Sequence, residues 1–121
     1  MPFIRLSTTK KIESDTEKKL IDALGLALGK IPGKDPQWTM VEVNDGMRMY
    51  FGGEKQSDMV FADVKYVGKF SFHKKKEFTV AALESIHEVL GTPIDRICLT
   101  ISEFENWGAV GGFRDIYFDE S

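Results

Sequence analysis

The chain has 121 residues, of which 42% are hydrophobic and 29% charged, a composition typical of one folded domain. The net charge of −3 gives no electrostatic reason to expect nucleic acid, and a single cysteine, Cys98, excludes a scaffold held by intramolecular disulfides. No apolar run approaches the ~20 residues of a membrane span, and no signal peptide is recognisable. We therefore expect one cytoplasmic domain over residues 1–121.

The first part of the chain predicts a strand followed by a helix. The short apolar segment 3–7 is typical of a strand with partly buried alternate positions. Ser14 and Glu17 match a capping box, so we expect Ser14 to cap a helix. Gly29, followed closely by prolines, is expected to end it.

A hairpin is predicted next. The alternating segment 38–43 and the apolar segment 47–51 flank Asn44-Asp45-Gly46, which is a strong turn signal. These two segments are therefore expected to pair with each other as antiparallel strands.

The second half of the chain repeats the order of the first. A strand is predicted over 60–67, a helix over 73–90 and a strand over 96–102, and Gly91 ends the helix. This is a duplicated βαβ unit, which predicts an α+β fold with a four-stranded mixed sheet and two helices on one face. The other face of the sheet is left without cover, so we expect another copy of the chain to provide it.

Residue types common in metal and phosphate sites are sparse. His73 and His87 have no Cys or carboxylate at ligand spacing, so we expect no metal site. The glycine-rich segment 107–113 lacks the Lys-Ser/Thr of a phosphate loop, and we expect a C-terminal loop there. Cys98 lies in the middle of a predicted strand without a neighbouring His, which favours a buried, inert thiol.

The N-terminus carries the most unusual feature. Pro2 directly precedes the first predicted strand, and removal of Met1 would give Pro2 a free secondary amine. An α-amino group ionises near ~7.7–8.0, and a dry pocket or a nearby cation lowers this pKa. The neutral amine would then be suited to act as a general base.

Five motifs occur in a specific order along the chain: Pro2-Phe3-Ile4, Gly33-Lys34-Asp35-Pro36-Gln37-Trp38, Phe51-Gly52-Gly53, Val67-Gly68-Lys69 and Pro93-Ile94-Asp95-Arg96-Ile97. With these motifs the chain resembles, from Pro2 to about Phe113, the macrophage migration inhibitory factor branch of the tautomerase superfamily. The resemblance implies a homotrimer with sites between subunits. It also implies keto–enol conversion of α-keto acids such as phenylpyruvate, without metal or cofactor.

The resemblance assigns roles to three residues near the expected base. It implies that Pro2 is the catalytic base and that Lys34 binds the substrate carboxylate and lowers the pKa of Pro2. It also implies that Val67 contacts the substrate through its backbone amide. The partners expected are thus a small carboxylate substrate and two further copies of the chain, with no nucleic acid and no membrane.

Other positions depart from the family pattern. The Tyr and Asn that the adjacent subunit usually supplies correspond to Cys98 and Thr100, so an aromatic wall and a hydroxyl are lost at Cys98. Phe113 is expected to form a wall of the pocket, and Trp107 is a candidate for further aromatic surface.

Three functions remain open from the sequence. The first is a phenylpyruvate tautomerase-like isomerase in the cytoplasm, with release from the cell without a signal peptide as the alternative location. The second is a hydratase, decarboxylase or dehalogenase acting on a small unsaturated acid, for which Glu103, Arg114 and Asp115 are candidate additional groups. The third is a trimeric binding or signalling protein with a vestigial pocket, which the changes at Cys98 and Thr100 favour.

Overall fold

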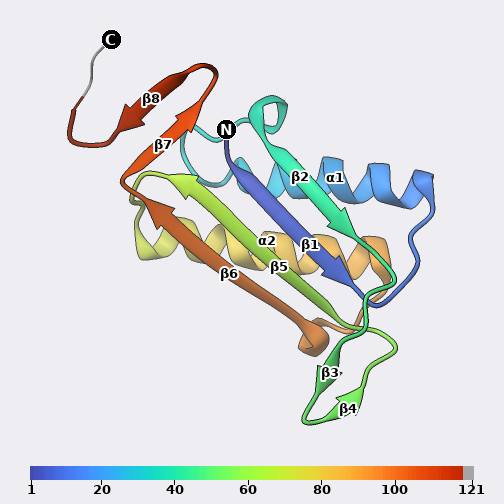
Figure 1. Cartoon of the computed structure of the whole chain (residues 1–121). Coiled ribbons are helices and arrows are strands. Elements are labelled where there is room, and N and C mark those ends of the chain that lie inside the picture. The colour runs from blue at the N-terminus through green and yellow to red at the C-terminus, as the bar shows by residue number, and fades with distance from the viewer. Residues whose placement is uncertain (119–121) are drawn as a thin grey trace.

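The computed structural model describes residues 1–118, in which two helices pack on one face of a four-stranded sheet (Figure 1). The sheet contains β1 (Phe3–Thr8), β2 (Met40–Asn44), β5 (Val60–Val67) and β6 (Ile97–Phe104), and the helices are α1 (Ser14–Leu28) and α2 (Phe72–Leu90). Short 3-10 helices, η1 (Pro36–Trp38) and η2 (Ile94–Arg96), precede β2 and β6. Two small hairpins complete the fold: β3 (Tyr50–Phe51) with β4 (Glu54–Lys55), and β7 (Asn106–Ala109) with β8 (Gly112–Asp115).

The topology confirms the predicted duplication. The strand order is β2-β1-β5-β6, in which β1 and β2 are parallel, β5 and β6 are parallel, and the central pair β1 and β5 is antiparallel. Each parallel pair is connected through one helix, as a βαβ unit requires. The two units are therefore joined edge to edge, with Ile4 opposite Val64 at the junction.

The helix ends agree with the sequence prediction except at the start of α1. Ser14 is the first helical residue and Glu13 is the cap, with no side-chain capping bond, so the predicted capping box is wrong. At α2 the Ser71 hydroxyl accepts a hydrogen bond from the Lys74 backbone amide and caps the helix. Gly29 and Gly91 end the two helices, as predicted, and Gly91 does so in the left-handed conformation with φ 76°.

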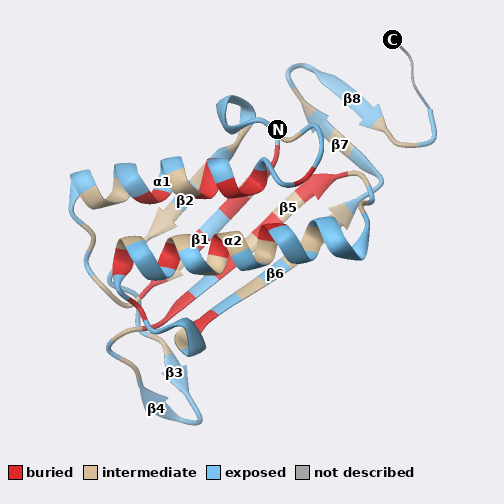
Figure 2. Cartoon of the chain, turned by 180° about the vertical axis from the view of Figure 1, so that it is seen from behind, coloured by how far each residue is buried: buried red, intermediate tan, exposed pale blue. Residues whose placement is uncertain are grey.

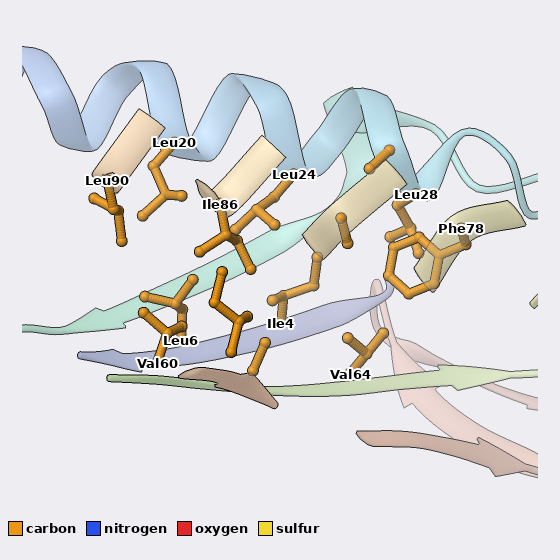
Figure 3. Packing of buried hydrophobic residues seen from close by; sticks show 14 of the residues in the cluster. Ile4, Leu6, Leu20, Leu24, Leu28, Val60, Val64, Phe78, Ile86 and Leu90 are labelled. Carbon is orange, nitrogen blue, oxygen red and sulfur yellow. The ribbon is translucent and has the colours of Figure 1, made fainter. Parts of the chain in front are cut away.

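The core lies between the helices and the covered face of the sheet. Side chains from α1 and α2 point towards alternate residues of β1 and β5 (Figure 3). The members labelled in that view are Ile4, Leu6, Leu20, Leu24, Leu28, Val60, Val64, Phe78, Ile86 and Leu90. Burial is concentrated on this side of the molecule, whereas the outer surfaces of the helices are exposed (Figure 2). Removal of this apolar surface from water is the main stabilising contribution to the fold.

The opposite face of the sheet has no covering helix, as predicted, and it carries charged pairs beside the exposed apolar side chains of Met40 and Phe61. Arg5 pairs with Glu42 at 2.7 Å, and Lys65 pairs with Asp63 at 3.6 Å. Cys98 lies on β6 and is exposed, so the prediction of a buried thiol is wrong. The reason is strand alternation: the neighbours of Cys98 along β6 contribute to the core, which turns Cys98 to the open face.

The predicted hairpin does not form. β2 pairs with β1 in parallel, and the hairpin is made instead by β3 and β4 around Gly52-Gly53, whose φ angles are 59° and 82°. The Asp45 carboxylate accepts a hydrogen bond from the Ile12 backbone amide at 2.9 Å. This contact attaches the turn to the segment between β1 and α1. The chain after β2 therefore leaves the sheet and does not fold back to pair with β2.

The glycine-rich segment 107–113 also differs from the prediction. It forms most of the antiparallel hairpin β7–β8, with Trp107 opposite Arg114, rather than a loop. Val110 and Gly111 make the turn with φ angles of 52° and 72°. Within residues 1–118, no helix is both long enough and apolar enough to cross a membrane.

Candidate active site

The N-terminus and the β7–β8 hairpin lie at the same end of the sheet (Figure 1). A cavity of ≈ 250 Å³ lies there. It is lined by Met1, Val67, Trp107, Ala109, Val110, Gly112, Phe113 and Arg114. A second hollow of ≈ 330 Å³ shares Met1 and Trp107 with it. The first residue and the last hairpin therefore meet at one site whose size is suited to a small molecule.

Pro2 anchors the chain beside this cavity. The residue is buried, and its carbonyl accepts a hydrogen bond from the Met40 backbone amide at 2.8 Å. The free α-amino group of the chain belongs to Met1. Partial burial, and then repulsion by the Lys34 ammonium and by Arg114, lowers the pKa of that amino group below its usual value. An amine at this end of the chain is thus biased towards its neutral, basic form.

Lys34 lies in the loop between α1 and η1 and reaches across to the end of β5. Its Nζ donates a hydrogen bond to the Val67 carbonyl at 2.9 Å. The same nitrogen lies 5.3 Å from the ring centre of Tyr66 and 5.5 Å from that of Phe70. Burial, and then repulsion by Arg114, lowers the pKa of Lys34. The half-buried Lys34 side chain therefore brings a positive charge to the site and, within residues 1–118, donates one hydrogen bond from an ammonium that has three donors.

A polar cluster around Glu103 binds the two aromatic residues that the Lys34 ammonium contacts. One oxygen of Glu103, Oε2, accepts hydrogen bonds from the Tyr66 hydroxyl at 3.1 Å and from the Phe70 backbone amide at 2.8 Å. The other oxygen, Oε1, is 3.1 Å from the Lys75 Nζ. Burial by itself raises the pKa of Glu103, but the bonds from Phe70, Lys75 and Tyr66 outweigh it, and the pKa is lowered. Burial, and then the Glu103 carboxylate, raises the pKa of Tyr66.

The structure divides the residues expected from the sequence into two groups. Pro2, Lys34, Val67 and Phe113 gather at the N-terminal end of the sheet. Val67 faces Lys34 with its carbonyl, and Phe113 lines the cavity with 74% of its surface exposed.

Cys98 and Thr100 form the second group and do not line that cavity in the same chain. They occupy alternate positions of β6 on the open face of the sheet, where the Thr100 hydroxyl donates to the Asp63 carboxylate at 3.3 Å. Their side chains are exposed on a surface that this chain leaves uncovered.

Sequence reasoning missed part of the site. Arg114 was a candidate without a location, and the structure places it in the cavity with Met1. The Asp115 carboxylate instead accepts a bond from the Tyr117 backbone amide. Tyr66 and Phe70 were not predicted at all, although both stand within a few residues of the Val67-Gly68-Lys69 motif, which was the available signal.

Comparison with known proteins agrees with this arrangement. The sequence profile of the family described as macrophage migration inhibitory factor (MIF) matches residues 1–113. The crystal structure of Leishmania major MIF2 superposes with a TM-score of 0.84 at 21% identity, over 94% of this chain and 97% of the other. No curated protein matches the sequence.

Two further solved structures have the same fold. Pt0534 inactivated by 2-oxo-3-pentynoate has a TM-score of 0.81 at 16% identity, over 91% of this chain and 93% of the other. A symmetric trimer of fused 4-OT has a TM-score of 0.81 at 14% identity, with the same coverage of 91% and 93%. The chain thus has the fold of the MIF2, Pt0534 and 4-OT structures. Because the family profile spans almost the whole chain, the protein belongs to the macrophage migration inhibitory factor family.

Proposed function

We propose that the protein is a cofactor-independent keto–enol tautomerase of small α-keto acids such as phenylpyruvate, with Pro2 as the general base once Met1 is removed. The observation that carries the proposal is the meeting of the chain's N-terminus, Arg114 and an aromatic wall in one cavity, with the Lys34 ammonium held at Val67 beside it. The inactivator of the similar protein Pt0534 is, by its name, a 2-oxo acid, which supports this substrate class.

In the proposed reaction the neutral Pro2 amine takes a proton from the carbon next to the ketone. The electron pair of that C–H bond forms the enolate, and a proton is returned to oxygen to give the enol. Lys34 binds the substrate carboxylate, and its charge disfavours the protonated amine. Trp107 and Phe113 supply apolar surface beside the substrate.

The proposed assembly is a homotrimer. Two observations support it: the open sheet face carries exposed Cys98 and Thr100, and a structure with the same fold is described as a symmetric trimer. In such an assembly those two residues would reach a neighbouring subunit's site, as the family resemblance implies. A Cys in place of an aromatic residue would leave that site wider.

A second candidate function is favoured by Arg114. Hydration, decarboxylation or dehalogenation of a small unsaturated acid uses an additional cation, and Arg114 supplies one in the cavity next to the N-terminus. Conversion of a 3-halo or acetylenic acid by the purified protein, with loss of turnover in Arg114→Ala, would favour this candidate over the tautomerase.

The tautomerase is tested by following enol–keto conversion of phenylpyruvate by ultraviolet absorbance. Intact mass first establishes that Met1 is absent, and Pro2→Gly is the matched variant because it keeps an N-terminal amine but removes the secondary amine. We expect the variant to lose most of the activity. Weak activity that Pro2→Gly leaves unchanged would contradict the proposal and favour the third function, a binding protein with a vestigial pocket.

A further inference from the structure

We infer that Glu103 is a positioning residue for Lys34: it fastens the two aromatic rings against which the Lys34 ammonium lies, and so holds that ammonium at the site. Its effect on substrate rests on the proposed function, whereas its effect on the location of Lys34 does not.

The contact of Lys34 with the two rings is the first step of this inference. Tyr66 and Phe70 meet edge to face, with ring centres 5.5 Å apart and an angle of 72° between the planes. The Lys34 Nζ lies within 5.5 Å of both ring centres, which is the range of a cation–π interaction. The two rings and the Val67 carbonyl together define where the ammonium sits.

One oxygen of Glu103 binds both Tyr66, through its hydroxyl, and Phe70, through its backbone amide. Its Oε2 accepts the Tyr66 hydroxyl at 3.1 Å and the Phe70 backbone amide at 2.8 Å. The Glu103 side chain is only 18% exposed, so water can replace these bonds only in part. If Oε2 is removed, the buried Tyr66 hydroxyl and the Phe70 backbone amide both lose this acceptor, and the 68–70 loop remains bound to β6 only at its start, where the Gly68 amide donates to the Phe104 carbonyl at 2.9 Å within residues 1–118.

The backbone of the same loop leaves little room for adjustment. Gly68 has a φ of 114°, and a Cβ at that position would lie 3.0 Å from Cε2 of Phe70. The Phe70 ring therefore packs directly on the Gly68 backbone. The backbone conformation of Gly68 is one that residues with a side chain rarely adopt. The Phe70 ring contacts Gly68, and the Phe70 backbone amide donates to Glu103, so the position of the ring depends on both contacts.

Glu103 acts on Lys34 by geometry rather than by charge. Burial, and then Arg114, lowers the Lys34 pKa, and Glu103 is not among these causes. The Lys75 ammonium lies 3.1 Å from the other Glu103 oxygen, whereas the hydrogen bond of the Lys34 ammonium within residues 1–118 goes to the Val67 carbonyl. Glu103→Gln keeps an acceptor for both ring attachments, whereas Glu103→Ala removes it.

The direct test is the nuclear magnetic resonance signal of the Lys34 side-chain methylene protons, assigned by its loss in Lys34→Ala. Protons held over two aromatic rings are shifted upfield by the ring currents. We expect this upfield shift to be lost in Glu103→Ala and kept in Glu103→Gln. Lys75→Ala is the matched control, because it removes only the partner of Oε1, and it should keep the shift.

Kinetics supply the second readout. In Glu103→Ala we expect KM for phenylpyruvate to rise about tenfold with little change in kcat, and the pKa in the kcat/KM profile to move upward, because Lys34 no longer repels the protonated base. Glu103→Gln and Lys75→Ala should stay within about twofold of wild type. A purely structural role of Glu103 would lower the melting temperature but leave KM and this pKa unchanged.

Besides unchanged kinetics in Glu103→Ala, the resonance experiment has outcomes that overturn the inference. One is an unchanged Lys34 signal in folded Glu103→Ala; the other is an equal loss of the shift in Lys75→Ala. If Glu103→Ala does not fold, Tyr66→Phe replaces it, since it keeps the ring and removes only the hydroxyl bond, and an unchanged Lys34 signal there is equally contrary. Absence of any Pro2-dependent activity in wild type would contradict the proposed function alone, because the Lys34 signal is measured without substrate.

Discussion

The Lys34 ammonium donates a hydrogen bond to the Val67 carbonyl at 2.9 Å and thereby connects the loop after α1 to the end of β5. Because β5 runs alongside β1, the same contact brings a positive charge to the end of the sheet where the chain begins. This relationship determines how the proposed base and the proposed carboxylate site influence each other.

Lys34→Ala should weaken turnover far more than it weakens folding. The substitution removes a charge-assisted contact with the substrate carboxylate, which corresponds to a loss in kcat/KM of ~1.5–3 kcal/mol. Lys30→Ala is the matched control, because Lys30 is an exposed lysine of the same loop. Equal kinetics of the two variants, at equal melting temperatures, would show that Lys34 does not bind the substrate.

The pH dependence of kcat/KM should follow the ionisation of the N-terminal amine. Burial and the Lys34 ammonium both disfavour the protonated form, as they do for the amino group of Met1, so the pKa should lie below the ~7.7–8.0 of a free α-amino group. Activity should therefore rise with pH up to this lowered pKa and then level off. A preparation that retains Met1, shown by mass, should lose most of the activity because the Pro2 nitrogen is then an amide and cannot act as the base. Full activity in that preparation would refute the mechanism.

Arg114→Ala should move the same ionisation upward by less than Lys34→Ala does. Arg114 repels the amino group of Met1 less strongly than Lys34 does, and we expect the same order at the Pro2 amine. The comparison requires pH profiles of both variants, measured at one ionic strength because salt screens these charges. A larger shift in Arg114→Ala than in Lys34→Ala would contradict the assigned order.

The protein should be a homotrimer in solution. The open face of the sheet exposes the apolar side chains of Met40 and Phe61, which another copy of the chain would remove from water. Light scattering coupled to size exclusion should give three times the 13.7 kDa chain mass at micromolar concentration. A monomer mass would also remove Cys98 and Thr100 from any site shared between subunits.

Phe78→Ala should cost about 3–5 kcal/mol of unfolding free energy, because the Phe78 ring is fully buried between α2 and the sheet. Phe72→Ala on the same helix should change stability by no more than about 0.5 kcal/mol, because Phe72 is 71% exposed. Urea denaturation of the two variants measures the difference. Similar losses in both would mean that Phe72 is covered in solution, for instance by another chain.

Local sequence patterns were sufficient for the duplicated unit. The strand 60–67 was predicted with the bounds that the structure has, and Gly29 and Gly91 were correctly predicted to end the helices. Alternation and helical periodicity are properties of neighbouring residues, so they can be recognised without knowledge of the rest of the molecule. The residues expected around Pro2 came from motif order rather than from periodicity, and the structure brings Lys34 and Val67 into contact.

Tertiary contacts decided the features that the sequence did not predict. Asn44-Asp45-Gly46 looks like a hairpin turn locally, but Asp45 is bound by the distant Ile12 amide and the chain pairs elsewhere. Cys98 stands in the middle of an apolar strand, which favours burial, but its exposure depends on which face of the sheet the helices cover. Arg114 reaches the cavity only because the last hairpin folds back towards the first residue. Each of these outcomes depends on residues far apart in the chain, whose contacts exist only once the sheet has formed.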